Sequence, residues 1–135
     1  MNEPLRILVL DDEIEIVNMV KRTLELRGHS VRGETNPALA LHALAREMHD
    51  LVLLDILMPE ANGLSLISEI LKLQPKTAIV VISALIDPHL AALATQEGGT
   101  ACLAKPINWT ELDRVVQSVQ RQESRFTPKP GVFSK

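Results

Sequence analysis

Four short apolar runs of the sequence each end in side chains that could take part in phosphoryl transfer. They end in Asp11-Asp12, Asp55, Ser83 and Lys105. A carboxylate can attack phosphorus and form an aspartyl phosphate. A lysine and a divalent cation can neutralise the charge on the transferring group, and a hydroxyl can donate a hydrogen bond to the product. These residue types predict a phosphoryl-transfer site, provided that the fold brings them together.

The three acids of this set predict a bound cation. At about 4 Å and an effective dielectric constant near 20, each pair of carboxylates repels by roughly 4 kcal/mol. Such a cluster requires either raised pKa values or a cation. Oxygen ligands at a partly open site suit Mg²⁺, which keeps some of its waters and accepts one or two carboxylates plus a phosphate oxygen. We therefore expect Mg²⁺ as the cofactor.

Each of these residues alone has an ordinary structural explanation. An aspartate after a strand is more often a helix cap than a catalyst. A single serine is most simply a turn residue, and a single lysine is most simply a surface charge. The functional interpretation therefore depends on all four positions lying in register at one edge of a sheet.

The apolar runs predict that sheet. Each run is continuous rather than alternating, which is typical of strands buried on both faces of a parallel sheet. We predict strands at 7–10, 51–54, 78–82 and 101–104, with a weaker edge strand at 30–33. With a strand order of 2-1-3-4-5, the first and third strands are neighbours, and the polar residues meet in the crevice at the carboxyl ends of the strands.

Helices are predicted between the strands. The first carries Ile16, Val20 and Leu24 at four-residue spacing and ends near Gly28. The others are predicted to begin after Asn36-Pro37, Asn62-Gly63, Asp87-Pro88 and Asn108, the last forming a capping box with Glu111. The predicted fold class is α/β, a doubly wound, flavodoxin-like (βα)5 sandwich with a five-stranded parallel sheet of order 2-1-3-4-5.

The composition excludes several classes of function. The 135 residues carry a net charge of −3, and only 2% of them are aromatic, so neither a basic surface nor stacking platforms for nucleic acid are expected. No apolar stretch approaches the roughly 18 residues of a membrane span, and no signal peptide is visible. The lone Cys102 fits a reducing compartment. We expect a cytoplasmic protein that binds neither nucleic acid nor membrane.

One domain is expected at residues 1–121, followed by a tail or linker at 122–135, where the helical period is lost and prolines accumulate. The 4 histidines are scattered along the chain, with no second ligand at metal spacing. We expect them to be solvated surface residues.

The same residues carry a family resemblance. Over about residues 6–120 the chain resembles the receiver domains of response regulators in two-component signal transduction, including the chemotaxis regulators. In chain order, the matching pieces are Asp11-Asp12, the run 55–59 with Gly63 following, Ser83-Ala84, and Gly98 leading to Lys105-Pro106.

The resemblance implies a metal site. Asp12 and Asp55 would bind Mg²⁺ directly, together with the backbone carbonyl of Leu57. Asp11 would act through a coordinated water.

The resemblance also implies the reaction. Asp55 would receive a phosphoryl group from a sensor histidine kinase, a phosphotransfer protein or a small phosphodonor, and Ser83 and Lys105 would bind the phosphoryl oxygens. Such a domain catalyses only its own phosphorylation and dephosphorylation and is not otherwise an enzyme. The family further suggests that the Lys105-Pro106 bond is cis.

In such proteins phosphorylation is a switch. The new charge draws the Ser83 hydroxyl inward, and the face made by the fourth helix, fifth strand and fifth helix repacks. That face then meets an output domain, a target or a second copy of the chain. The resemblance implies a structural role in this switch for Pro59, Gly63 and Pro106.

The sequence departs from the family pattern at three positions. Cys102 stands where these proteins usually carry Tyr or Phe, so no comparable aromatic swing is available. We interpret it as a core-facing thiol, with redox sensing as the alternative. Leu57 and Leu85 occupy places where polar side chains often influence water attack on the phosphoryl group. Either they shield that group and lengthen its lifetime, or they simply pack their loops.

Three other classes of protein are alternatives to a phosphorylated receiver domain. A pseudo-receiver, which keeps the fold as a phosphorylation-independent interaction scaffold, is the main alternative. A phosphatase of the aspartyl-phosphate type would need a second acid at position 57, which is Leu57. A flavin carrier would need aromatic residues, and only Trp109, Phe126 and Phe133 are available. Trp109 is interpreted as a cover for the edge of the core rather than a partner contact.

Overall fold

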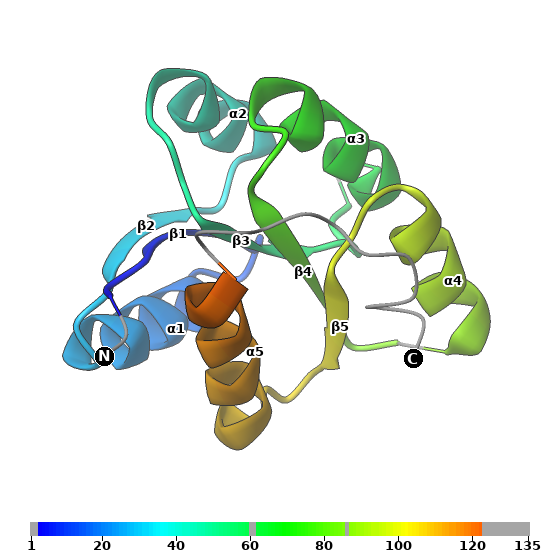
Figure 1. Cartoon of the computed structure of the whole chain (residues 1–135). Helices are drawn as coiled ribbons and strands as arrows, with labels where there is room; N and C mark the ends of the chain where they lie inside the picture. Colours follow the sequence, from blue (N-terminus) through cyan, green and yellow to red (C-terminus); the bar gives the residue numbers. More distant parts are fainter. Residues whose placement is uncertain (1–2, 60–61, 86, 123–135) are drawn as a thin grey trace.

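The computed structural model describes residues 3–59, 62–85 and 87–122. Five parallel strands form one sheet of order β2-β1-β3-β4-β5, and a helix follows each strand along the chain (Figure 1). The strands are β1 (Arg6–Leu10), β2 (Ser30–Glu34), β3 (Leu51–Asp55), β4 (Ala78–Ser83) and β5 (Ala101–Ala104). The helices are α1 (Ile14–Leu26), α2 (Pro37–Arg46), α3 (Gly63–Leu73), α4 (Pro88–Gln96) and α5 (Trp109–Gln122). The predicted fold class and strand order are confirmed.

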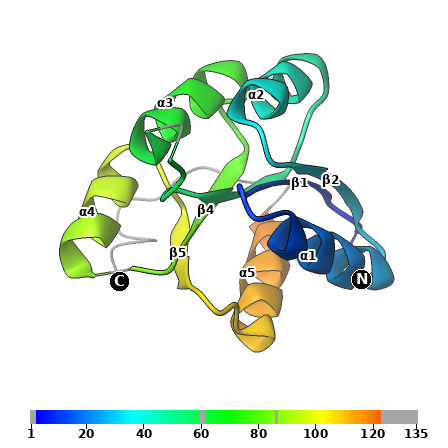
Figure 2. The same ribbon diagram turned by 180° about the vertical axis from the view of Figure 1, so that it is seen from behind.

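The sheet has a hydrophobic core on each face. Helices α1 and α5 cover one face, and α2, α3 and α4 cover the other (Figures 1 and 2). Alternate residues of β1 show the division, since Ile7 and Val9 belong to the first core while Leu8 and Leu10 belong to the second. Burial on both faces explains why the strands read as continuous apolar runs.

Helix boundaries follow the predicted capping residues. The side chains of Asn36, Asn62 and Asp87 each accept hydrogen bonds from backbone N–H groups in the first turns of α2, α3 and α4. Asn108 caps α5 by accepting a bond from Glu111 N at 3.1 Å. Within the described residues, the Asn108 N–H makes no return hydrogen bond to the Glu111 side chain, so the predicted capping box is only half formed.

Two glycines end helices in a backbone conformation that other residues rarely adopt. Gly28 after α1 has φ 97°, and Gly98 after α4 has φ 112°. The amides of Gly28 and of His29 bond back to the carbonyls of Glu25 and Leu24, which closes the end of α1. Gly28 was predicted as this stop.

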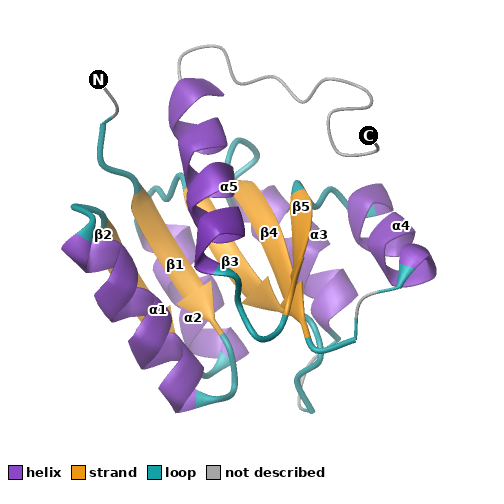
Figure 3. Ribbon diagram, turned by 90° about the horizontal axis from the view of Figure 1, so that it is seen from below, coloured by secondary structure: helices purple, strands orange, loops and turns teal. Residues whose placement is uncertain are grey.

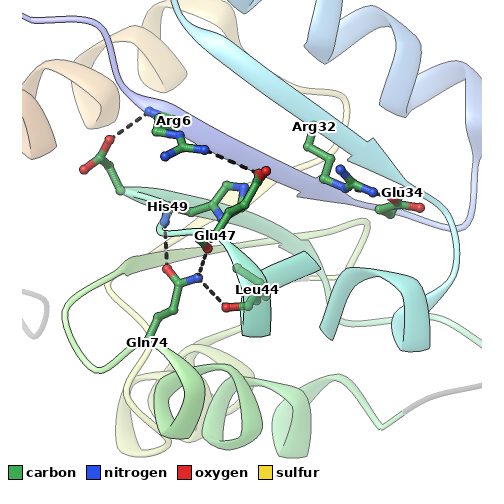
Figure 4. A network of polar contacts seen from close by, with 8 residues as sticks. Arg6, Arg32, Glu34, Leu44, Glu47, His49 and Gln74 are labelled. Atoms are coloured by element: carbon green, nitrogen blue, oxygen red, sulfur yellow. Dashed lines mark hydrogen bonds and ion pairs between the residues drawn. The ribbon is translucent and has the colours of Figure 1, made fainter. Parts of the chain in front are cut away.

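The expectation that all histidines lie on the surface is wrong for His49. Its side chain is buried, and its backbone N–H donates to Gln74 Oε1 at 2.8 Å (Figure 4). Gln74 is also buried and donates through Nε2 to the carbonyls of Leu44 and Glu47. This one side chain therefore ties the end of α3 to the connection between α2 and β3, at the amino end of the sheet.

The predicted boundary at residue 121 falls inside a helix, because α5 continues to Gln122. The rest of the predicted tail, residues 123–135, lies outside the described residues. Across the residues that are described, no helix is both long and apolar enough to span a bilayer.

Candidate functional site

The strand ends bring the predicted site residues to one edge of the sheet. The strands run parallel, so their carboxyl ends lie together (Figure 3). Asp55 is the last residue of β3 and Ser83 the last of β4, while Asp11-Asp12 and Lys105 directly follow β1 and β5. Each of Asp11, Asp12 and Asp55 offers a carboxylate oxygen within 4.8 Å of the others. The predicted acidic cluster is thus present.

Lys105 reaches this cluster from β5, across the end of β4. Its Nζ lies 2.9 Å from Asp11 Oδ2, 3.3 Å from Asp55 Oδ2 and 3.0 Å from Glu13 Oε1. The side chains of Asp11 and Asp55 are 2% and 3% exposed, whereas that of Glu13 is 59% exposed. The ammonium therefore lies between two buried carboxylates, Asp11 and Asp55, which form the floor of the site, and one exposed carboxylate, Glu13, which lies at its rim.

The Asp11 carboxyl is held in an unfavourable environment. Burial raises its pKa to about 6, and the charge of Asp55 adds to the rise, while the hydrogen bond from Glu13 N and the contact with Lys105 act in the opposite direction. Desolvation thus outweighs the neighbouring ammonium. Burial would by itself lower the pKa of Lys105, but its contacts with Asp11 and Glu13 outweigh burial, so the pKa is raised and Lys105 stays charged.

The two oxygens of the Asp11 carboxylate differ in their hydrogen bonds. Oδ1 accepts a hydrogen bond from Glu13 N at 2.8 Å. Oδ2 is buried and, within the described residues, accepts no aligned hydrogen bond. The 2.9 Å contact with the Lys105 ammonium is an ion pair without hydrogen-bond alignment, so it compensates the charge of Oδ2 without satisfying it as an acceptor. A buried, unsatisfied carboxylate oxygen beside two more carboxylates fits a hard divalent cation such as Mg²⁺.

Asp12 is the exposed member of the cluster. It lines a hollow of about 290 Å³ together with Thr35, Pro37, Met58 and Pro59. The hollow lies between the loop after β2 and the loop after β3. The hollow therefore adjoins the exposed member of the acidic cluster.

Within the described residues, the Ser83 hydroxyl forms its hydrogen bonds with Leu85 and none with Asp55. This hydroxyl is fully buried, donates to the carbonyl of Leu85 and accepts from Leu85 N, both at 3.1 Å. The Ser83 backbone carbonyl accepts from Lys105 N at 2.9 Å. The predicted hydroxyl is therefore at the correct strand end, but its hydrogen bonds go to its own loop.

The loop after β3 fixes one side of Asp55. Leu57 N donates to Asp55 Oδ1 at 3.0 Å, and the Leu57 side chain is 47% exposed. Gly63 begins α3 against this loop, because a Cβ on Gly63 would lie 2.3 Å from the Cα of Ile56. Only a glycine permits this close approach. The role of the Leu57 carbonyl as a metal ligand stays a prediction.

The fifth strand carries two further predicted positions. The Lys105–Pro106 peptide bond is cis, as the resemblance suggested. Cys102 is half-buried and packs against the core on the side of α2, α3 and α4, and burial raises the pKa of its thiol. The interpretation of a core-facing thiol agrees with this placement. Trp109 packs against the core on the side of α1 and α5.

Glu13 is the residue of this site that the sequence reasoning missed. The acidic pair after β1 is in fact a run of three acids, Asp11-Asp12-Glu13. That run was the available signal, but nothing in it showed that Glu13 would turn toward a lysine 92 positions later.

The fold and the site define a known class of protein. A sequence profile of the family described as "Response regulator receiver domain" matches residues 7–117. The chain therefore belongs to the family of response regulator receiver domains.

Individual relatives agree with this assignment. The chain is 32% identical over 119 residues to the C4-dicarboxylate transport transcriptional regulatory protein DctD of Rhizobium meliloti, covering 88% of this chain and 25% of that protein. It is 32% identical over 117 residues to the chemotaxis protein CheY of Thermotoga maritima, covering 86% of this chain and 95% of that protein. Several curated relatives are much longer, and the chain spans only 23% to 52% of their length.

A solved structure with a modified aspartate is also similar. The crystal structure of a response regulator protein from Burkholderia pseudomallei, described with a phosphorylated aspartic acid, a calcium ion and citrate, superposes with a TM-score of 0.77 at 30% identity. The superposition covers 88% of this chain and 68% of that one.

Proposed function

We propose that this receiver domain accepts a phosphoryl group on Asp55 in a Mg²⁺-dependent reaction and acts as a switch in a two-component or phosphorelay pathway. The observation that carries the proposal is the Lys105 ammonium 3.3 Å from Asp55 Oδ2, beside three acids grouped closely enough to hold a metal ion. The phosphorylated aspartic acid and calcium ion of the B. pseudomallei relative give further support, since Ca²⁺ and Mg²⁺ are both hard cations that bind oxygen.

Asp55 is the nucleophile in this reaction. One carboxylate oxygen attacks the phosphorus of a phosphohistidine, the O–P bond forms as the P–N bond breaks, and the imidazole nitrogen keeps the bonding pair. Leu57 N orients the carboxylate through Oδ1. The Lys105 ammonium neutralises charge on the phosphoryl oxygens.

The metal would be held by Asp12, Asp55 and the backbone carbonyl of Leu57, with Asp11 acting through a water. When bound, Mg²⁺ supplies charge neutralisation to the phosphoryl oxygens.

The switch would begin at Ser83. In the structure the Ser83 hydroxyl is bonded to Leu85. A phosphoryl group on Asp55 offers that hydroxyl a charged acceptor, and a charge-assisted hydrogen bond is stronger than a neutral one. The loop after β4 then shifts with the hydroxyl, and the face of α4, β5 and α5 repacks to meet an output domain, a target or a second copy of the chain.

The wider role follows from these steps. The donor is a sensor histidine kinase or a phosphotransfer protein, and a small acyl phosphate can replace it. The domain catalyses only its own phosphorylation and dephosphorylation. We place it in the cytoplasm, which the unpaired Cys102 thiol fits.

An intact-mass measurement separates this proposal from the pseudo-receiver alternative. The chain is incubated with Mg²⁺ and acetyl phosphate, alongside Asp55→Asn. A single phosphoryl adduct on the wild type that Asp55→Asn lacks supports the switch. The absence of an adduct with either acetyl phosphate or a phosphohistidine donor would favour the scaffold.

A further inference from the structure

We infer that Glu13 is a positioning residue. It holds the Lys105 ammonium at the solvent-facing side of the acidic cluster, where the ammonium can bind the phosphoryl group on Asp55. The inference rests on the proposed function of Asp55. It concerns a contact that phosphoryl transfer does not by itself require, between the N-terminus of α1 and the residue after β5.

The Lys105 ammonium bonds to one buried and one exposed carboxylate. Nζ forms aligned hydrogen bonds to Glu13 Oε1 at 3.0 Å and to Asp55 Oδ2 at 3.3 Å. Asp55 is on the buried floor, whereas Glu13 is on the exposed rim. Asp55 has no room for a phosphoryl group at the buried level, so that group would extend outward toward solvent. Glu13 therefore holds the ammonium on the solvent-facing side of Asp55.

The other two partners of Lys105 are shared with the proposed metal. Asp11 and Asp55 belong to the group that could hold a cation. A divalent ion there weakens the attraction of both carboxylates for the ammonium, because the two cations repel and share the same negative charges. Of the three carboxylates that reach Lys105 within the described residues, Glu13 alone lies outside that group. It keeps its hold on Lys105 when the metal sites are filled.

The local structure leaves Glu13 free for this task. Glu13 is the N-cap residue of α1, yet its side chain makes no capping hydrogen bond. Its backbone N–H donates to Asp11 Oδ1 at 2.8 Å, which ties it to the pocket. The side chains that usually cap a helix at this position are the shorter ones of Ser, Thr, Asp and Asn. Here the carboxylate reaches Lys105 instead.

Binding of beryllofluoride, a stable mimic of a phosphoryl group on a carboxylate, tests the inference. The dissociation constant is measured by calorimetry at saturating Mg²⁺, and the rate of phosphorylation by acetyl phosphate is measured by intact mass. Glu13→Gln is expected to weaken binding and slow phosphorylation by about two- to fivefold, the range for an ion pair with one exposed partner. Glu15→Gln, which removes the same charge in the first turn of α1, is the matched control and should change neither quantity.

A double-mutant cycle tests whether Glu13 acts through Lys105. In the Lys105→Ala background, Glu13→Gln should have no further effect on beryllofluoride binding. The same cycle, measured by urea unfolding in EDTA, should show favourable coupling between the two residues without metal or donor. Equal or tighter binding by Glu13→Gln, an effect that persists without Lys105, or zero coupling in EDTA would overturn the inference. A wild type that takes up neither beryllofluoride nor phosphoryl would overturn the proposed function as well.

Discussion

The ammonium nitrogen of Lys105 lies 3.3 Å from Oδ2 of Asp55, although 50 residues separate them in the sequence. The two strands that carry them are not neighbours, since β4 lies between β3 and β5. Lys105 therefore reaches over the end of β4, past Ser83, to meet a carboxylate on the buried floor. This relationship gives the acidic cluster its compensating charge, and the proposed phosphorylation of Asp55 rests on it.

Magnesium should stabilise the fold through the acidic cluster. A ligand that binds only the native state adds about 1.4 kcal/mol to the free energy of unfolding at tenfold its dissociation constant. We expect Mg²⁺ to raise the melting temperature of the wild type and EDTA to reverse the change. Asp12→Asn should lose most of this shift, and Glu69→Gln, an exposed acid in α3, should keep it. Equal shifts in the two variants would contradict the assignment of Asp12.

Leu57 should protect the acyl phosphate from water. Its exposed side chain lies two residues after Asp55 on the loop that orients the carboxylate. Leu57→Asn, which replaces an apolar group by one able to bond water, is expected to shorten the lifetime of the phosphorylated state severalfold. The decay is followed by intact mass after removal of the donor. Leu73→Asn, at an exposed leucine of α3, is the control. Equal lifetimes for wild type and Leu57→Asn would reduce Leu57 to loop packing.

His29 should make the stability of the fold depend on pH. Its Nδ1 accepts a hydrogen bond from Leu5 N at 3.0 Å, which requires the neutral ring. Burial, with a contribution from Arg27, lowers its pKa from 6.5. As the pH falls below 6.5, the unfolded chain takes up the proton first, so this contribution is complete above 6.5 and is lost as the pH falls through the lowered pKa.

His29→Asn provides the comparison, because an asparagine oxygen can accept the Leu5 bond without titrating. Urea unfolding at pH 7.5, 6 and 5 should show a steeper loss of stability in the wild type than in His29→Asn. Parallel pH profiles would show that the ring is protonated equally easily in the folded and unfolded states.

Gln74 should be worth far more to stability than an ordinary glutamine. Its side chain, 2% exposed, satisfies the backbone N–H of His49 and the carbonyls of Leu44 and Glu47. Gln74→Leu leaves these groups without that partner, which should cost about 2–4 kcal/mol in the free energy of unfolding. Denaturant unfolding measures the loss, and Gln96→Leu on the exposed end of α4 is the control. If Gln74→Leu lowers the free energy of unfolding by less than Gln96→Leu does, water takes over the hydrogen bonds of the Gln74 side-chain amide.

The grouping of the candidate site residues was readable from the sequence because it depends on where parallel strands end. Any residue at the carboxyl end of a buried strand in this topology reaches the same edge of the sheet, so the sequence alone predicts that Asp55 and Lys105 lie close together. The location of such residues at the edge of the sheet is set by the path of the backbone.

Contacts that depend on side-chain packing were not readable in this way. The hydrogen bonds of Ser83 to Leu85 and the reach of Glu13 to Lys105 follow from loop conformation and rotamers. The hydrogen bond from the His49 backbone N–H goes to Gln74, which is 25 positions away. Neither periodicity nor capping signals carry information about such long-range polar pairs.

Chemical trapping of the acyl phosphate tests the central claim most directly. The chain is treated with Mg²⁺ and acetyl phosphate and then with borohydride, which reduces an aspartyl phosphate to homoserine, and the peptide that spans residue 55 is sequenced by mass spectrometry. We predict homoserine at position 55 and at no other aspartate, with none formed when Mg²⁺ is replaced by EDTA. Unmodified aspartate at position 55 together with a phosphoryl adduct elsewhere in the chain would contradict the account.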